Sequence, residues 1–297
     1  MRPIGSISMV TVVAMLAVAG TASASTLAVD KGGTLRFTAA RGEANNVNLQ
    51  SVGLQTVVTD SGSVIHAGNG CMQVSAHQAS CPLPASFSQD VAMTLGDRND
   101  AALAFKISDG SVAIDGGLGD DTIQDSPQVG ANVDGGPGDD TITVHPNFGA
   151  SVDVHGGLGR DRITAISASG TVDGGIGDDT ITLTTFVEPS PGASAAFGGL
   201  GDDTITADGA TAMGLIDGGL GDDRISTGEF SAVAEMRGGF GDDRITSQHG
   251  TSTITGGFGK DVIDGGDEGD TIDCGAGVDR FVRYDGDTVS NCEIAQP

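Results

Sequence analysis

The sequence predicts an all-β protein, a parallel solenoid of the β-roll or β-helix type, and three observations support this fold class. Glycine accounts for 49 of the 297 residues without the strict three-residue period of collagen, an excess typical of turn-rich repeat architectures. Tryptophan is absent, tyrosine occurs once, and aromatic residues make up 4% of the chain, so we expect a thin, aliphatic core. A nine-residue motif rich in glycine and aspartate also recurs through the second half of the chain.

The motif occurs ten times in phase. Every copy has aspartate at the sixth place, and the eighth place is isoleucine in nine copies and Phe281 in the tenth. Such regular spacing over so many copies indicates one structural unit repeated along the chain. Counted from the first place of the motif, the copies start at residues 116, 135, 156, 174, 198, 218, 238, 256, 265 and 274.

Each copy predicts a turn followed by a short strand. Successive glycines allow backbone conformations closed to other residues, so the chain can turn sharply and direct carbonyl oxygens inward, where the aspartate adds a carboxylate. Hard oxygen ligands on a flexible turn suit Ca²⁺. The residues after the aspartate, such as Thr-Ile-Thr at 204–206, alternate polar, apolar and polar, which predicts a strand with only the isoleucine inward. A second apolar strand precedes most glycine pairs, as in VAIDGG at 112–117, so one coil holds two strands.

The motif resembles the nonapeptide G-G-x-G-x-D-x-U-x of the RTX (repeats-in-toxin) hemolysin-type calcium-binding family. The resemblance covers about residues 95–297 and implies a β-roll that binds several Ca²⁺ ions between stacked turns. It supports a calcium-binding module more firmly than toxicity, because no apolar pore segment is present. The expected metal ligands are Asp121, Asp140, Asp161, Asp179, Asp203, Asp223, Asp243, Asp261, Asp270 and Asp279, with Gly117, Gly119, Gly136, Gly138, Gly157, Gly159, Gly175, Gly177, Gly199, Gly201, Gly219, Gly221, Gly239, Gly241, Gly257 and Gly259.

The spacing of the copies predicts a one-sided file of turns. In the family the copies repeat every nine residues and alternate between two edges of a flattened coil. Here the starts from 116 to 256 differ by 19, 21, 18, 24, 20, 20 and 18 residues, each one full coil plus zero to six, so consecutive copies stack on one edge. Irregular stretches such as 124–132 and 186–195 turn the other edge. Only the copy at 265 falls on that edge, with Asp287 as its one candidate neighbour.

Repulsion between the stacked aspartates predicts that a cation is needed for the repeats to fold. Coils lie about 4.8 Å apart, where two unit charges repel by on the order of 3 kcal/mol at an effective dielectric constant of about 20. One buried isoleucine contributes roughly 1.5 to 3 kcal/mol, so the repulsion offsets much of the core. We therefore expect the repeats to be largely unfolded without metal. The alternative is a solenoid whose aspartates only terminate turns through local hydrogen bonds.

The chain divides into three predicted segments. Residues 1–24 read as a signal peptide, with Arg2, an apolar run over 7–19 and small residues before a cut after Ala24; an uncleaved membrane anchor is the alternative. No later segment is apolar enough to span a membrane. Residues 25–94 read as degenerate β coils that cap the solenoid, with a separate ligand-binding domain as the alternative. Residues 95–297 form the calcium-binding β-roll, and LGDRNDAAL at 95–103 looks like a decayed repeat.

The four cysteines predict two disulfides in an extracytoplasmic compartment. Cys274 and Cys292 lie 18 residues, or one coil, apart. Equivalent positions on adjacent coils are about 4.8 Å apart, within the roughly 4.4 to 6.8 Å between the Cα atoms of a disulfide. We expect a bond that closes the last coil, with Cys71 and Cys81 as the second pair, although four cysteines allow three connectivities.

Charge and missing motifs define the expected function. The net charge of −26 repels nucleic acid and attracts cations. The chain contains no H-E-x-x-H and no G-x-S-x-G motif, so we expect no enzyme activity. The predicted function is a secreted calcium-binding protein that folds on binding Ca²⁺, with a structural or adhesive role at a glycan or cell surface. The alternative is a calcium-dependent β-helical enzyme acting on acidic polysaccharide, which would use basic residues among Arg160, Arg162, Arg224, Arg244 and Lys260.

Overall fold

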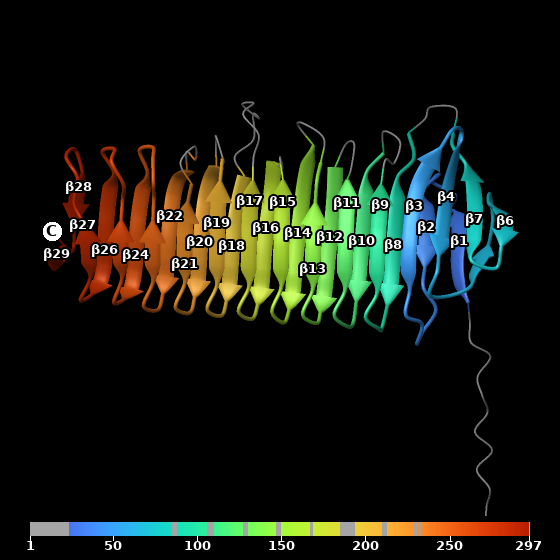
Figure 1. Ribbon diagram of the computed structural model, residues 1–297, viewed down its shortest axis with the longest axis horizontal. Helices are drawn as coiled ribbons and strands as arrows, with labels where there is room; N and C mark the ends of the chain where they lie inside the picture. Colours follow the sequence, from blue (N-terminus) through green and yellow to red (C-terminus); the bar gives the residue numbers. More distant parts are fainter. Residues whose placement is uncertain are drawn as a thin grey trace, which may run out of the picture.

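The computed structural model is a β-solenoid, which confirms the predicted fold class, and no helix occurs among the residues that it describes. Figure 1 shows its coils stacked along one long axis, from the blue N-terminal end to the red C-terminal end. All but the last residue of the predicted signal peptide lie outside the described part of the chain. The structure describes residues 24–84, 88–105, 110–126, 130–146, 150–166, 169–184, 194–209, 213–228, 231 and 233–296.

Two long sheets form the walls of the solenoid, because each coil contributes one strand to each sheet. The first sheet holds β1 (Ser25–Val29), β2 (Leu35–Thr38), β5 (Ile65–Ala67), β8 (Val91–Gly96), β10 (Val112–Gly117), β12 (Gly130–Pro137), β14 (Ser151–Leu158), β16 (Ser169–Ile176), β18 (Ser194–Leu200), β20 (Met213–Leu220), β22 (Val233–Phe240), β24 (Thr253–Gly259), β26 (Thr271–Gly277) and β28 (Thr288–Ser290). The second sheet holds β3 (Asn46–Val52), β4 (Gln55–Asp60), β6 (Met72–Ser75), β7 (Gln78–Pro82), β9 (Ala101–Phe105), β11 (Thr122–Ser126), β13 (Thr141–Val144), β15 (Arg162–Ile166), β17 (Thr180–Thr184), β19 (Thr204–Asp208), β21 (Arg224–Thr227), β23 (Arg244–Thr246), β25 (Val262–Asp264), β27 (Arg280–Val282) and β29 (Ile294–Gln296).

From β8 onward the strands pair in parallel and keep the repeat in register. Equivalent glycines of successive copies face one another, as Gly136 faces Gly157 and Gly157 faces Gly175. The glycine–aspartate turns therefore stack along one edge, the regular lower edge in Figure 1, as the spacing predicts. Strands of the second sheet end and those of the first sheet begin at the opposite edge, and the interval between them varies in length, as from Ser126 to Gly130 and from Thr184 to Ser194.

The core is a narrow aliphatic layer between the sheets, as the composition predicts. β13 alternates exposed Thr141 with buried Ile142, because successive side chains of a strand point to opposite faces. The eighth-place residues are all buried, with at most 7% of each side chain exposed, and residues such as Val154 and Ile216 close the layer from the first sheet. The buried file comprises Ile123, Ile142, Ile163, Ile181, Ile205, Ile225, Ile245, Ile263, Ile272 and Phe281.

The N-terminal region differs from a simple series of coils. Strands β2 and β3 do form one coil, which pairs in parallel with β8 and β9. The pairs β1–β2, β3–β4, β4–β7 and β6–β7 are instead antiparallel hairpin-like pairs. Their buried side chains, including Leu27, Val58 and Ile65, belong to the same core as the repeats. The domain boundaries at 24 and 94 remain predictions.

Both predicted disulfides are present. Cys71 bonds Cys81 with 4.2 Å between the Cα atoms, and Cys274 bonds Cys292 with 5.1 Å. The second bond links β26 to the segment that follows β28, one coil further on, and so closes the last coil as expected.

Candidate metal centre

Glycine at the second and fourth places lets the turns stack closely. Gly136 and Gly138 have φ values of 101° and 153°, which residues other than glycine rarely adopt. A Cβ atom on Gly136 would also collide with the carbonyl oxygen of Gly117 in the preceding turn. Backbone hydrogen bonds then join the turns, because Gly138 donates to Leu158 at 2.7 Å and Thr141 donates to Asp121 at 2.8 Å.

The sixth-place aspartates of this edge form a continuous buried file. Each side chain is at most 3% exposed, and its Oδ1 atom accepts the backbone N–H of the preceding member at 2.7 to 3.0 Å. The decayed repeat at 95–103 contributes the first member, Asp100, which the predicted ligands did not include. We call this set the inner file: Asp100, Asp121, Asp140, Asp161, Asp179, Asp203, Asp223, Asp243, Asp261 and Asp279.

The second carboxylate oxygen of every member of the inner file is buried and lacks a hydrogen-bond partner. In the turn at 135, the space over the Cα atom of Gly135 is lined by Oδ2 of Asp140 and by the carbonyl oxygen of Gly156 in the next turn. The same pair of oxygens recurs at each first-place glycine from 116 to 256, with Cys274 supplying the last carbonyl. Buried polar atoms are normally satisfied, so a row of unpartnered oxygens facing carbonyl oxygens fits a row of cations.

The first-place glycines were not among the predicted ligands. The predicted glycine ligands are those at the second and fourth places, which lie on the same turns and in the left-handed backbone region. Their role as ligands remains a prediction. The first-place glycines nearest the unpartnered oxygens are Gly116, Gly135, Gly156, Gly174, Gly198, Gly218, Gly238 and Gly256.

Burial makes the charged form of the inner file costly. It raises the pKa of Asp121, Asp179 and Asp243 to about 7 and that of Asp223 to about 8, from the usual 3.8. Neighbouring carboxylates add to the rise, while the hydrogen bond to Oδ1 opposes it. Burial likewise raises the pKa to about 6 for Asp100, Asp140, Asp161, Asp203 and Asp261. Burial therefore disfavours the ionised form of these carboxyls, and a bound cation would relieve that penalty.

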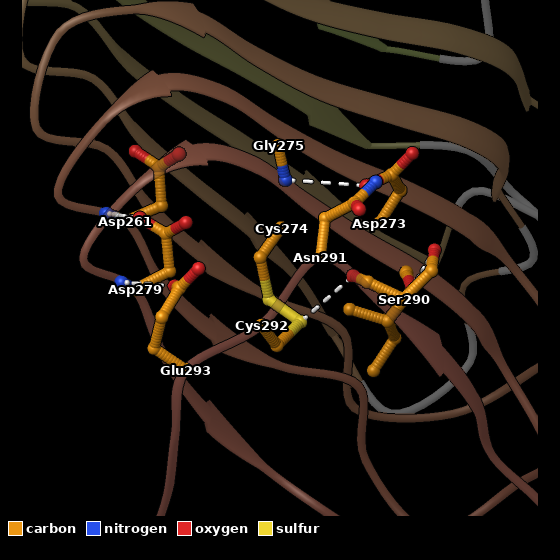
Figure 2. The surroundings of a disulfide bond; sticks show 10 residues. Asp261, Asp273, Cys274, Gly275, Asp279, Ser290, Asn291, Cys292 and Glu293 are labelled. Carbon is orange, nitrogen blue, oxygen red and sulfur yellow. Dashed lines mark hydrogen bonds between the residues drawn. A yellow bond between two sulfur atoms is a disulfide. The ribbon is translucent and has the colours of Figure 1, made fainter.

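The inner file ends differently at its two ends. At the N-terminal end the backbone N–H of Asn45 donates to Oδ1 of Asp100 at 2.6 Å, so a neutral amide residue takes the next position. At the other end Asp279 donates to Oε2 of Glu293 at 3.0 Å. Figure 2 shows Asp261, Asp279 and Glu293 following one another beside the Cys274–Cys292 disulfide. Glu293 belongs to no copy of the motif, and its only sequence signal is its place directly after Cys292.

A second, exposed file lies at the fifth place of the motif. There Oδ1 of each aspartate accepts the N–H of the fifth-place residue in the next coil, the reverse direction to the inner file. Arg160 interrupts this row and pairs with Asp139 at 2.9 Å. We call this set the outer file: Asp120, Asp139, Asp178, Asp202, Asp222 and Asp242.

Among the described residues of the opposite edge, Asp270 lies in a similar environment. Asp270 is 1% exposed, accepts the N–H of Ser252 at 2.6 Å and has an unpartnered Oδ2 atom. The backbone N–H of Asp270 donates to Oδ1 of Asp287 at 3.0 Å, so Asp287 is the neighbour that the spacing predicts. Burial raises the pKa of Asp270 to about 6. Because Ser252 replaces an aspartate on the other side, Asp270 borders a single carboxylate-lined gap.

The donor set fits a hard cation held mainly by backbone oxygens. Among the residues that the structure describes, no three side chains of His, Cys, Asp or Glu converge on one point. An ion in the inner file would therefore take carboxylate oxygens from the file and complete its shell with glycine carbonyls, the oxygen-only ligands that Ca²⁺ accepts.

No family model matches this chain, and no curated protein matches it. The two disulfides are typical of proteins in an oxidising, extracellular environment. In the described residues, the structure has no helix of the length and apolar character needed to cross a bilayer.

Proposed function

We propose that this chain is a secreted calcium-binding protein of the RTX type, whose solenoid folds when Ca²⁺ ions occupy the inner file. The observation that carries the proposal is the row of buried, unpartnered Oδ2 atoms, which from Asp121 to Asp261 each lie beside a backbone carbonyl oxygen of the next turn. The two disulfides and the predicted signal peptide support secretion.

Calcium suits this donor set better than magnesium. Ca²⁺ takes six to eight oxygen ligands in a flexible geometry, whereas Mg²⁺ demands a near-ideal octahedron and keeps several waters. The turns offer buried carboxylate oxygens beside backbone carbonyl oxygens. Extracellular modules bind Ca²⁺ with dissociation constants of roughly 10⁻⁴ to 10⁻³ M, so the chain would stay unfolded in a low-calcium cytoplasm and fold outside.

A matched pair of variants tests the proposal by calorimetric titration with Ca²⁺ and with Mg²⁺ at pH 7.5. Asp203→Asn, Asp223→Asn and Asp243→Asn together neutralise three members of the inner file. Asp202→Asn, Asp222→Asn and Asp242→Asn remove the same charge from the outer file in the same turns. We expect the inner variant to bind fewer Ca²⁺ ions and the outer variant to bind as many as the unchanged protein. Equal losses in the two variants, or binding of Mg²⁺ as tight as that of Ca²⁺, would overturn the proposal.

Because the proposed solenoid is a rigid rod that folds outside the cell, we expect it to have a structural or adhesive role. The expected partner is a glycan or a cell surface. The enzyme alternative has one supporting observation, because Arg224 and Arg244 face each other in register on adjacent strands and their side chains are exposed. Incubation of the calcium-loaded protein with polygalacturonate separates the two. Cleavage that depends on Arg224 and Arg244 would favour the enzyme, and the proposal expects none.

A further inference from the structure

In the eight copies of the motif from 116 to 256, the third place carries an apolar residue that lies on the outside of the turn. Seven of these side chains are large and between 43% and 58% exposed, and the eighth, Pro137, is also exposed. Neither the motif nor the proposed calcium sites need an apolar residue there, because the core is closed by the eighth-place file. We call this set the apolar ridge: Leu118, Pro137, Leu158, Ile176, Leu200, Leu220, Phe240 and Phe258.

The ridge is continuous because its members are paired in register from coil to coil. Leu158 faces Ile176, and Ile176 faces Leu200, across adjacent strands. The rings of Phe240 and Phe258 stack with 4.8 Å between their centroids. Seven steps of about 4.8 Å make the ridge about 34 Å long. Soluble monomers rarely expose a contiguous apolar strip of this extent, and such strips mark interaction sites.

Rows of carboxylates border the ridge on both sides. On the side of the second sheet lies the outer file, which is exposed throughout. On the side of the first sheet lie the residues that precede the glycine pairs; four are exposed or half-buried aspartates, Asp115, Asp134, Asp173 and Asp217, and the row is interrupted by His155, Phe197, Arg237 and Thr255. In β12, for example, Asp134 lies between buried Val133 and Gly135, so alternation along the strand directs its side chain away from the core.

This pattern of charge selects the partner. A second copy of the chain would bring its own acidic rows against these rows, at a net charge of −26 on each molecule. An anionic membrane is repelled for the same reason. A partner with an apolar stripe between two rows of lysine or arginine is complementary in both respects. An amphipathic α-helix has this form, and its 5.4 Å pitch lies close to the coil spacing of about 4.8 Å.

We propose that the apolar ridge is the docking surface for a cationic amphipathic helix of a protein partner, with the apolar stripe of the helix on the ridge and its basic residues against the two acidic rows. A helix that covers the full length of the ridge has about 23 residues at 1.5 Å per residue.

Two synthetic peptides of 23 residues serve as probes: one with a leucine stripe flanked by lysines, and one with the same composition in scrambled order. The ridge variant combines Leu200→Ser, Leu220→Ser and Phe240→Ser. The control variant combines Leu54→Ser, Met72→Ser and Val74→Ser, which removes three exposed apolar side chains elsewhere. Both variants keep every charge, so unspecific attraction of a cationic peptide to the acidic protein is the same in both.

Binding is measured by fluorescence anisotropy of labelled peptide in millimolar calcium, after circular dichroism has established that each variant is folded. We expect the unchanged protein and the control variant to prefer the striped peptide by about tenfold or more, and the ridge variant to lose this preference. If the triple variant does not fold, Phe240→Ser with Phe258→Ser takes its place, since both rings are more than half exposed.

Three outcomes would overturn the proposal. The first is an undiminished preference in the ridge variant. The second is a dimer of the unchanged protein in sedimentation velocity that the ridge variant does not form, which would assign the ridge to a second copy. The third is binding to phosphatidylcholine vesicles that the ridge variant loses, which would assign it to a lipid surface.

Discussion

Replacing Asp179 by asparagine is expected to change stability in opposite directions with and without calcium. Asp179 is 1% exposed, and its Oδ1 atom accepts the N–H of Asp161 at 2.7 Å, a bond that the amide oxygen of asparagine preserves. Only the unpartnered Oδ2 atom is replaced, by an NH₂ group. Asp178→Asn is the matched control, because Asp178 is the exposed neighbour in the same turn and its Oδ1 atom also accepts a backbone N–H.

The expected magnitudes follow from the raised pKa of Asp179. A rise from 3.8 to about 7 penalises the charged side chain by about 4 kcal/mol, at about 1.4 kcal/mol per unit. The buried NH₂ group costs roughly 1 to 3 kcal/mol, so the calcium-free variant is more stable by roughly 1 to 3 kcal/mol. With calcium at 100 times its dissociation constant, each occupied site contributes about 2.7 kcal/mol. Asp179 borders two gaps, so about 5 kcal/mol of binding is lost and the calcium-loaded variant is less stable by roughly 2 to 4 kcal/mol.

The calcium-free comparison is made at pH 7.5 with an osmolyte that favours the folded state. It records the osmolyte concentration at which half of the molecules are folded. The calcium-loaded comparison records the urea concentration at half unfolding. We expect Asp179→Asn to fold at a lower osmolyte concentration and to unfold at a lower urea concentration than the unchanged protein. Asp178→Asn should change the free energy of unfolding by no more than about 0.5 kcal/mol in either condition. Destabilisation of the same size in both conditions would give Oδ2 of Asp179 a role that does not involve a cation, contrary to this prediction.

Three further predictions concern pH, the disulfide and the opposite edge. In calcium-free solution the folded carboxyls hold their protons up to about pH 6 to 8, whereas unfolded aspartates release them near pH 3.8. The free energy of unfolding should therefore be greatest below about pH 4 and fall as the pH rises to 8. A melting temperature that rises over this range, measured after treatment with a chelating resin, would be contrary to this. The double variant Cys274→Ser, Cys292→Ser should exchange backbone hydrogens faster in β28 and at an unchanged rate in β16. The reason is that the bond closes an 18-residue loop at the end of a rod whose coils contact only their neighbours. Uniformly faster exchange along the chain would argue against a local role. Asp270→Asn should lower the calcium stoichiometry by at most one and the affinity less than Asp179→Asn does, because Ser252 occupies one side of Asp270; equal losses of affinity would show that the two edges are equivalent.

The repeats could be predicted because each coil repeats the same local signals. The spacing of Asp121, Asp140 and Asp161 fixes which turns share an edge, and the Thr-Ile-Thr triplets fix which side chain enters the core. The Cys274–Cys292 bond followed from the same arithmetic. These predictions needed only the coil length and the two-residue period of a strand.

The missed features depend on contacts between segments that share no pattern. The antiparallel pairs of the N-terminal region, such as β3 with β4, have no periodic motif to reveal their partners. Asn45 and Glu293 join the ends of the inner file only through folding of the terminal coils. The nearness of the Gly135 and Gly156 turns to Oδ2 of Asp140 depends on backbone angles that the motif permits but does not specify.

Circular dichroism of the chain during a calcium titration at pH 7.5 shows whether the solenoid folds only when calcium is bound. The account predicts little β-sheet signal in chelator and a cooperative gain of β structure as calcium reaches roughly 10⁻⁴ to 10⁻³ M. Equal β-sheet signal in chelator and in millimolar calcium, with no heat of calcium binding, would contradict it.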